Sequence, residues 1–155
     1  MIYCGKKLDH RQYKVAKQIY SVWRRSYRIE ADLLDIEDFP PLRRSVNQIM
    51  AAESDFYGYW QEERLTAVSE IEHLEAQHIH IAALVVDPDF FRQGLASRLL
   101  TEVLDLLDWR RVTVDTAVAN IPAINLYKKL GFTPLKQWQT PDNIPMITLH
   151  REQVL

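Results

Sequence analysis

A short polar loop between an apolar run and a helical pattern is the part of this chain best suited to bind an anion. The residues Arg92-Gln93-Gly94-Leu95-Ala96-Ser97 follow Leu84-Val85-Val86 and open into a stretch where leucine and valine recur at helical spacing. The first backbone N–H groups of a helix have no intrahelical acceptor and carry partial positive charge. Gly94 allows a phosphate to come close to that backbone. The sequence therefore predicts an anion cradle at a strand-to-helix junction, with an ordinary turn as the alternative.

Strands and helices alternate in the part of the chain that must position this loop. A helix that begins at Gly94 follows an apolar strand. A second helix has a proline in its first turn and ends at a C-cap glycine. The expected elements are strands at Ile79–Val86 and Arg111–Thr116, a helix from Asn120 to Leu130, and closing strands at Phe132–Gln139 and Met146–Arg151 around a turn at Thr140–Asn143. This order predicts a mixed α/β sheet.

The first half of the chain begins with helices and then changes to the period of two that is typical of strands. Asp9 is expected to be an N-cap, with Gln12 as its capping-box partner, for a helix that reaches about Tyr27. The other expected elements are a strand at Ile2–Cys4, a loop or short helix at Arg28–Pro41, a helix at Leu42–Ala52, and strands at Phe56–Trp60 and Leu65–Leu74 around a turn at Gln61–Arg64.

Composition excludes several classes of protein. The chain has 155 residues, 47% of them hydrophobic and 26% charged, as in a single globular domain. A net charge of -2 gives no general attraction for nucleic acid, and the single Cys4 excludes an internal disulfide. No apolar run is long enough to cross a bilayer and no signal segment precedes the domain, so we expect a cytoplasmic protein. His73, His78 and His80 lie across an expected turn and offer no convincing metal-ligand set.

Two segments in the same order carry a family resemblance. The first is the loop after Val85, and the second runs from Asn120 to Tyr127 and on to Gly131-Phe132. Together they resemble the GNAT superfamily of acyl-CoA-dependent N-acyltransferases. The resemblance covers roughly residues 55–151 and implies a GNAT-type fold, in which about four helices flank a mixed, twisted sheet of about six to seven strands. Residues 1–155 would then form one N-acetyltransferase domain, with residues 1–54 as the variable acceptor side and residues 55–151 as the strands and coenzyme A core.

The resemblance implies acetyl-CoA as the co-substrate and assigns its binding residues, with no metal. Backbone groups of the loop would hold the pyrophosphate, the edge of the preceding strand would pair with the pantetheine arm, and Asn120 would contact that arm or the phosphates while capping its own helix. The implied set is Leu84, Val85, Val86, Arg92, Gln93, Gly94, Leu95, Ala96, Ser97, Asn120 and Tyr127. Phe91 departs from the family pattern, because the first loop position is usually glutamine or arginine. That departure removes one side-chain contact and leaves the backbone cradle.

Direct transfer of an acetyl group to an amine requires a base, an oxyanion donor and an acid. The resemblance implies Tyr127 as the acid beside the departing thiolate, and a β-bulge that aims a backbone N–H near Val85 or Val86 at the oxyanion. His80 stands where several relatives carry a carboxylate, and a histidine is largely neutral at pH 7 to 8 and can accept a proton. Glu70 and Glu72 share a strand face and are rival bases.

The expected function is therefore transfer of an acetyl group from acetyl-CoA to a primary amine of a small molecule or peptide. A protein or peptide N-acetyltransferase would present an open groove between the N-terminal helices and the turn at Pro141-Asp142-Asn143, whereas a small-molecule enzyme would have a closed pocket. A non-catalytic acyl-CoA-binding regulatory module on the same fold is the alternative from another class. The closing hairpin could also support a homodimer.

Overall fold

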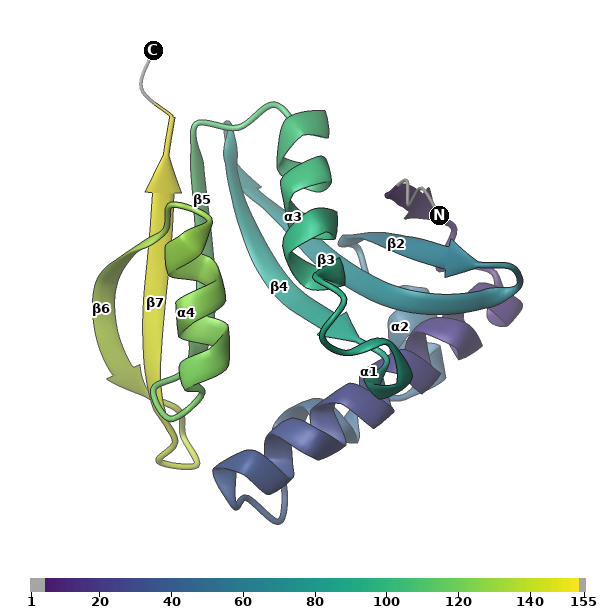
Figure 1. Cartoon of the computed structure of the whole chain (residues 1–155), viewed down its shortest axis with the longest axis horizontal. Helices are drawn as coiled ribbons and strands as arrows, with labels where there is room; N and C mark the ends of the chain where they lie inside the picture. Colours follow the sequence, from purple (N-terminus) through teal and green to yellow (C-terminus); the bar gives the residue numbers. More distant parts are fainter. Residues whose placement is uncertain (1–4, 154–155) are drawn as a thin grey trace.

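The structure, a computed structural model, describes residues 5–153, which form one seven-stranded sheet with helices on both faces (Figure 1). The strands are β1 (Lys6–Leu8), β2 (Asp55–Gln61), β3 (Arg64–Glu75), β4 (His78–Val86), β5 (Arg111–Ala117), β6 (Thr133–Gln139) and β7 (Pro145–Glu152). The helices are α1 (Tyr13–Leu34), α2 (Val46–Ala51), α3 (Leu95–Leu106) and α4 (Ile121–Lys129), with short 3-10 turns η1 (Pro40–Arg43) and η2 (Pro88–Phe90). None of these helices is long and apolar enough to cross a membrane.

The sheet is mixed, as the sequence predicts. Its strand order is β1-β2-β3-β4-β5-β7-β6, and β4 and β5 form a parallel pair at its centre. The other neighbouring strands pair antiparallel. The parallel pairing is short, because it runs only from His78↔Arg111 to Ile81↔Val114. Beyond that point β4 and β5 diverge (Figure 1).

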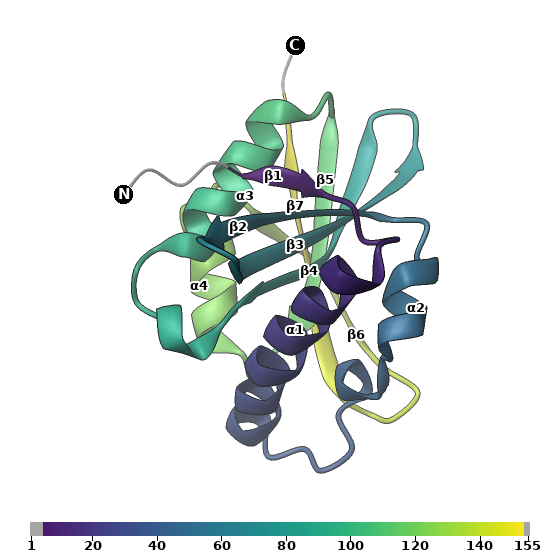
Figure 2. The ribbon, with the colours of Figure 1, turned by 90° about the vertical axis from the view of Figure 1, so that its right-hand side faces the viewer.

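Two apolar cores hold the helices to the sheet. On one face α3 and α4 bury Leu99, Val103 and Ile124 against β4 and β5. On the other face α1 and α2 bury Ile19 and Ile49 against the first half of the sheet (Figure 2). Residues in strands alternate between the two faces. Side chains on the two faces of β4 and β5 therefore meet different helices.

The first helix differs from the prediction at both ends. The chain enters α1 at Gln12, which is the N-cap, while Asp9 accepts a hydrogen bond from the Gln12 side chain at 2.9 Å. The helix does not stop near Tyr27 but continues to Leu34, where Asp35 in the left-handed region (φ 55°) ends it. The extension carries Ala31 into the buried interior, and this tertiary contact overrides the weak local pattern of residues 28–34.

The second helix is shorter than predicted. The double proline of Phe39-Pro40-Pro41 forms η1, and α2 then starts after Ser45, whose side chain forms a capping box with Gln48. The strands at 55–61, 64–75, 78–86, 111–117, 133–139 and 145–152 confirm the expected ones within a few residues. The strand expected at Ile2–Cys4 lies outside the described residues, and the first described strand is Lys6–Leu8.

Candidate active site

The loop before α3 has the backbone conformation that an anion cradle needs. Arg92 (φ 64°) and Gly94 (φ 72°) both lie in the left-handed region, and Gly94 is the N-cap of α3. The first helical hydrogen bond is donated by Arg98 to the Gly94 carbonyl at 3.1 Å. The N–H groups of residues 95–97 therefore have no acceptor within the helix. A Cβ placed on Gly94 would meet nothing within 4 Å, so the space above this backbone is open to a phosphate.

The side chains around the loop leave the backbone accessible. Arg92 and Gln93 are exposed. Leu95, the first residue of α3, is buried, and Ala96 and Ser97 in the same turn are half-buried. Phe91 is 40% exposed at the position where the family pattern has a polar residue. The described geometry thus supports a cradle built from backbone groups and not from side chains.

Beyond the point where it separates from β5, strand β4 has a free edge, which pairs with no other strand that the structure describes. In the β3–β4 register Glu70 pairs with Ala83 and Ile71 pairs with Ile81, so Ala82 is the extra residue of a β-bulge. This bulge follows the last β4–β5 pair, Ile81↔Val114, and bends β4 away from its neighbour. The bulge therefore precedes Val85 and Val86, near which it was expected.

The backbone direction along β4 identifies the groups on that free edge. Asp87 donates its N–H to Thr66 of β3 at 2.8 Å. Successive residues of a strand point their N–H groups to opposite sides, so the N–H groups of Val86 and Leu84 point away from β3, into the gap beside β5. Of the two candidates for the oxyanion donor, the register favours Val86 over Val85.

Tyr127 is buried on α4 with its ring edge-on to Phe132, at 5.7 Å between ring centroids. Burial, and secondarily the carboxylate of Glu30, raise the pKa of Tyr127 well above the ordinary value of a phenol. Among residues 5–153 no hydrogen bond engages its hydroxyl. Tyr127 therefore stays protonated at neutral pH, with a hydroxyl that is available to donate a proton or a hydrogen bond.

Asn120 joins α4 to α1. Its side-chain oxygen caps α4 by accepting from the Ala123 N–H at 3.2 Å, as the sequence predicts. Its amide nitrogen donates to Oε1 of Glu30 at 2.5 Å. The sequence reasoning missed Glu30, although the residue continues the apolar face of α1 that passes through Trp23 and Tyr27. An acidic residue on the otherwise apolar face of a helix is the sequence feature that could have identified Glu30.

His80 lies on the α1 side of the sheet, where hydrogen bonds and one longer ion-pair contact connect polar side chains of four strands. Its Nδ1 is 2.7 Å from the Thr113 hydroxyl, and its Nε2 is 3.6 Å from Oδ2 of Asp115. Asp115 accepts a hydrogen bond from Thr148, which in turn accepts from Trp138 Nε1 at 2.9 Å. Asp115 follows Val114, the last β5 residue paired with β4, so the His80–Asp115 pair stands where the two strands diverge.

Asp115 was also missed from the sequence. Aspartate is depleted in strand interiors, so its position inside Arg111–Thr116 was a signal. The neighbouring His78 shares the Thr113 hydroxyl at 3.1 Å, and burial, followed by the charge of Arg111, lowers its pKa. Among the described residues no group of three or more histidine, cysteine or acidic side chains could hold a metal ion.

The structure separates the two glutamates that were rivals to His80. Glu70 is buried and forms a two-point ion pair with Arg44, at 2.7 and 3.0 Å, and also accepts from the Ser54 hydroxyl. Three hydrogen bonds from the protein therefore already engage its two oxygens. Glu72 is exposed and lies opposite His80 in the β3–β4 register.

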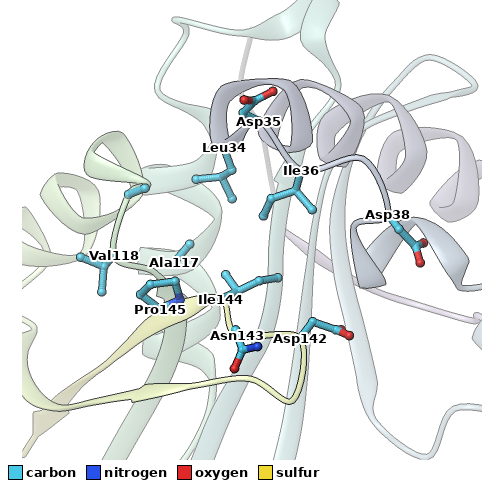
Figure 3. Close-up of a pocket in the computed structure, with 11 residues that line it drawn as sticks. Leu34, Asp35, Ile36, Asp38, Ala117, Val118, Asp142, Asn143, Ile144 and Pro145 are labelled. Carbon is cyan, nitrogen blue, oxygen red and sulfur yellow. The ribbon is translucent and has the colours of Figure 1, made fainter.

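A pocket of about 490 Å³, open to solvent, lies between the end of α1 and the β6–β7 turn (Figure 3). Leu34 and Ile36 face Ala117, Ile144 and Pro145 across it (Figure 3). The pocket is lined by residues 34–36, 38, 117–119 and 142–145. It lies between an N-terminal helix and the hairpin turn, at the place where the sequence predicts the acceptor groove of a peptide enzyme.

Comparison with known proteins agrees with this geometry. The profile of the acetyltransferase (GNAT) family matches residues 16–132. The chain is 30% identical over 144 residues to the UPF0157 protein YqkA of Bacillus subtilis (strain 168), which covers 92% of this chain and 42% of YqkA. It is 39% identical over 69 residues to the ribosomal protein bS18-alanine N-acetyltransferase of Escherichia coli (strain K12), which covers 43% of this chain and 45% of that enzyme. The chain thus spans less than half the length of these curated relatives.

Solved structures with the same fold cover nearly the whole chain. The ribosomal-protein-S18-alanine N-acetyltransferase from Escherichia coli superposes with a TM-score of 0.75 and 20% identity, over 97% of this chain and 94% of that one. The PaiA N-acetyltransferase from Thermoplasma acidophilum, solved in complex with coenzyme A, gives a TM-score of 0.77 at 15% identity, over 99% and 100% of the two chains. The family match spans most of the sequence and includes both the loop before α3 and the helix of Tyr127, so this chain belongs to the acetyltransferase (GNAT) family.

Proposed function

We propose that this domain transfers the acetyl group of acetyl-CoA to the α-amine at the N-terminus of a polypeptide. The observation that carries the choice of acceptor is the open pocket between the end of α1 and the β6–β7 turn. An open site at this position is expected of a peptide enzyme, whereas a small-molecule enzyme is expected to have a closed pocket. The partial similarity to an enzyme named for the alanine of ribosomal protein bS18 supports the same choice.

The donor would be held by the backbone. The N–H groups at the start of α3 would bind the pyrophosphate, because they are unpaired and carry the positive end of the helix dipole. The free edge of β4 at residues 84–86 would pair with the pantetheine amides as an added strand does. This arrangement directs the thioester along β4 toward the point where β4 and β5 diverge, where an N–H of the unpaired β4 edge would donate to the oxyanion.

The chemistry then needs one proton removed and one supplied. The acceptor arrives largely as an ammonium ion and must lose a proton before its nitrogen attacks the thioester carbon. His80, held by Thr113 and Asp115, would take that proton directly or through a water molecule. The nitrogen then adds to the thioester carbon, and the tetrahedral oxyanion collapses with cleavage of the C–S bond. The Tyr127 hydroxyl would protonate the departing thiolate and recover its proton from the nitrogen, which loses its second proton as the amide forms. The products are the N-acetyl peptide and coenzyme A.

The test is a panel of acceptors assayed by thiol release from acetyl-CoA. It includes peptides with different first residues, the same peptides blocked at the N-terminus, and polyamines, amino acids and aminoglycosides. We expect thiol release only with free peptide N-termini, and tandem mass spectrometry should locate the acetyl group on the α-nitrogen. Turnover confined to the small amines would reassign the acceptor class. Tight acetyl-CoA binding with no turnover on any amine would favour a non-catalytic module.

A further inference from the structure

Glu30 is a partly buried carboxylate that the steps above do not use. It lies on α1 one turn before Leu34, which lines the pocket, and it accepts from Asn120, the neighbour of the lining residue Ala119. The Glu30–Asn120 hydrogen bond therefore connects α1 to the start of α4 beside the pocket, between residues next to its lining. From there the charge of Glu30 reaches Tyr127, whose pKa it raises.

The protein leaves this carboxylate without a cation. Among residues 5–153, Glu30 takes part in no ion pair, and Asn120 is its hydrogen-bond donor. Glu70, the other interior glutamate on this side of the sheet, has Arg44 and Ser54 as partners. A partly buried carboxylate without a cation is destabilising, and its place beside the pocket would let a cation reach it from outside.

The geometry points to Glu30 as the residue that binds the ammonium group of the acceptor beside the pocket, where the end of α1 meets the start of α4. This inference rests on the proposed function, and it assigns to Glu30 a contact with the substrate. Binding there would place the amine next to the helix that carries Tyr127, the acid of the proposed mechanism. The proton would then pass from the ammonium to His80, while Glu30 offsets the positive charge before transfer.

The surroundings of Glu30 fit this role. Burial raises its pKa above the ordinary value of 4.5, and the hydrogen bond from Asn120 opposes that shift. The titratable groups that face it are Tyr27 on its own helix and Tyr127 on α4, and the pKa of both phenols is raised, so both are neutral at pH 7. Arg44 and Glu70 act on Tyr27 from the other side and form a pair of opposite charges. An arriving ammonium would thus meet a carboxylate with no competing cation.

The experiment compares Glu30→Gln with Asp32→Asn, which removes the same charge from an exposed position on α1. Kinetics are measured with the best acceptor of the panel, and acetyl-CoA binding is measured by calorimetry. Glu30→Gln should raise the acceptor KM about 10- to 100-fold, the loss of one charge-assisted hydrogen bond. It should leave acetyl-CoA affinity unchanged, and Asp32→Asn should behave as wild type.

A second readout separates substrate binding from folding. Wild type should bind the free-amine peptide more tightly than its N-acetylated form, and Glu30→Gln should lose that discrimination while remaining folded. An unchanged acceptor KM, or equal discrimination in both proteins, would overturn the role of Glu30 while leaving the acetyltransferase assignment intact. Absence of turnover by wild type on every amine would instead refute the proposed function, and the Glu30 inference with it.

Discussion

The substitution Glu70→Gln tests whether this carboxylate stabilises the fold or takes part in catalysis. Its two oxygens bind both terminal nitrogens of Arg44, and only 5% of the Glu70 side chain and 22% of the Arg44 side chain are exposed. The guanidinium also lies over the rings of Trp23 and Phe56, at 4.9 and 5.6 Å from their centroids. We therefore expect Glu70→Gln to damage the fold and not the chemical step.

The size of the effect follows from the burial of the pair. Breaking a fully buried ion pair by removing one partner costs about 3 to 5 kcal/mol, since it leaves an uncompensated charge. Arg44 retains some solvent contact, and glutamine can still accept one hydrogen bond, so we expect roughly 2 to 4 kcal/mol. For a domain of this size each kcal/mol lowers Tm by about 2 to 4 °C, which gives a loss of roughly 5 to 15 °C.

The assay is thermal and urea unfolding of Glu70→Gln, Arg44→Gln and the double variant, together with kcat per folded molecule. The double variant should be more stable than the sum of the two losses implies, with a coupling of about 1 to 3 kcal/mol. Turnover per folded molecule should stay within a few-fold of wild type. An unchanged Tm combined with a collapse of kcat would refute the reasoning and identify Glu70 as the base.

Four further predictions concern the site itself. Tyr127→Phe should lower kcat about 100-fold with little change in acetyl-CoA affinity, and equal losses in both would contradict an acid role. Asp115→Asn should also lower kcat, by about 10- to 100-fold, because His80 loses the carboxylate that orients it, and calorimetry should show unchanged donor binding. Gly94→Ala places a side chain at a φ of 72° and should cost about 1 to 2 kcal/mol of stability, with weaker acetyl-CoA binding. Since burial raises the pKa of Glu30 in the folded state, wild-type stability should fall as pH rises from the ordinary glutamate value through that raised pKa, and Glu30→Gln should lack this loss in thermal melts across pH.

Local patterns were sufficient for the elements around the proposed donor site. The loop before α3, the cap at Asn120 and the strands around them depend on residues close in sequence, and the structure has them where the patterns predict. The end of α1 did not follow from local patterns, because residues 28–34 are held in the helix by packing and by the cap at Asp35. The position of the bulge at Ala82 could not be predicted, since it depends on the register between β3 and β4.

The titratable groups were harder to predict, because their roles depend on distant partners. Glu70 and His80 share a side of the sheet, yet Glu70 is paired with Arg44, the residue after η1, whereas His80 lies beside Asp115 of β5. Glu30 and Asn120 are 90 residues apart in sequence and meet only because the fold brings the end of α1 to the N-cap of α4. The sequence pattern identified which residues are candidates for acid and base. Only the tertiary contacts show which of these side chains are already engaged by other side chains.

The most direct measurement is acetyl transfer to one unblocked peptide, with thiol release and the acetylated product quantified in the same reaction. We expect one coenzyme A thiol to be released for each acetyl group found on the peptide α-nitrogen, and no thiol release with the N-terminally blocked peptide. Thiol release that is independent of any amine, or acetylation confined to lysine side chains and small amines, would contradict it.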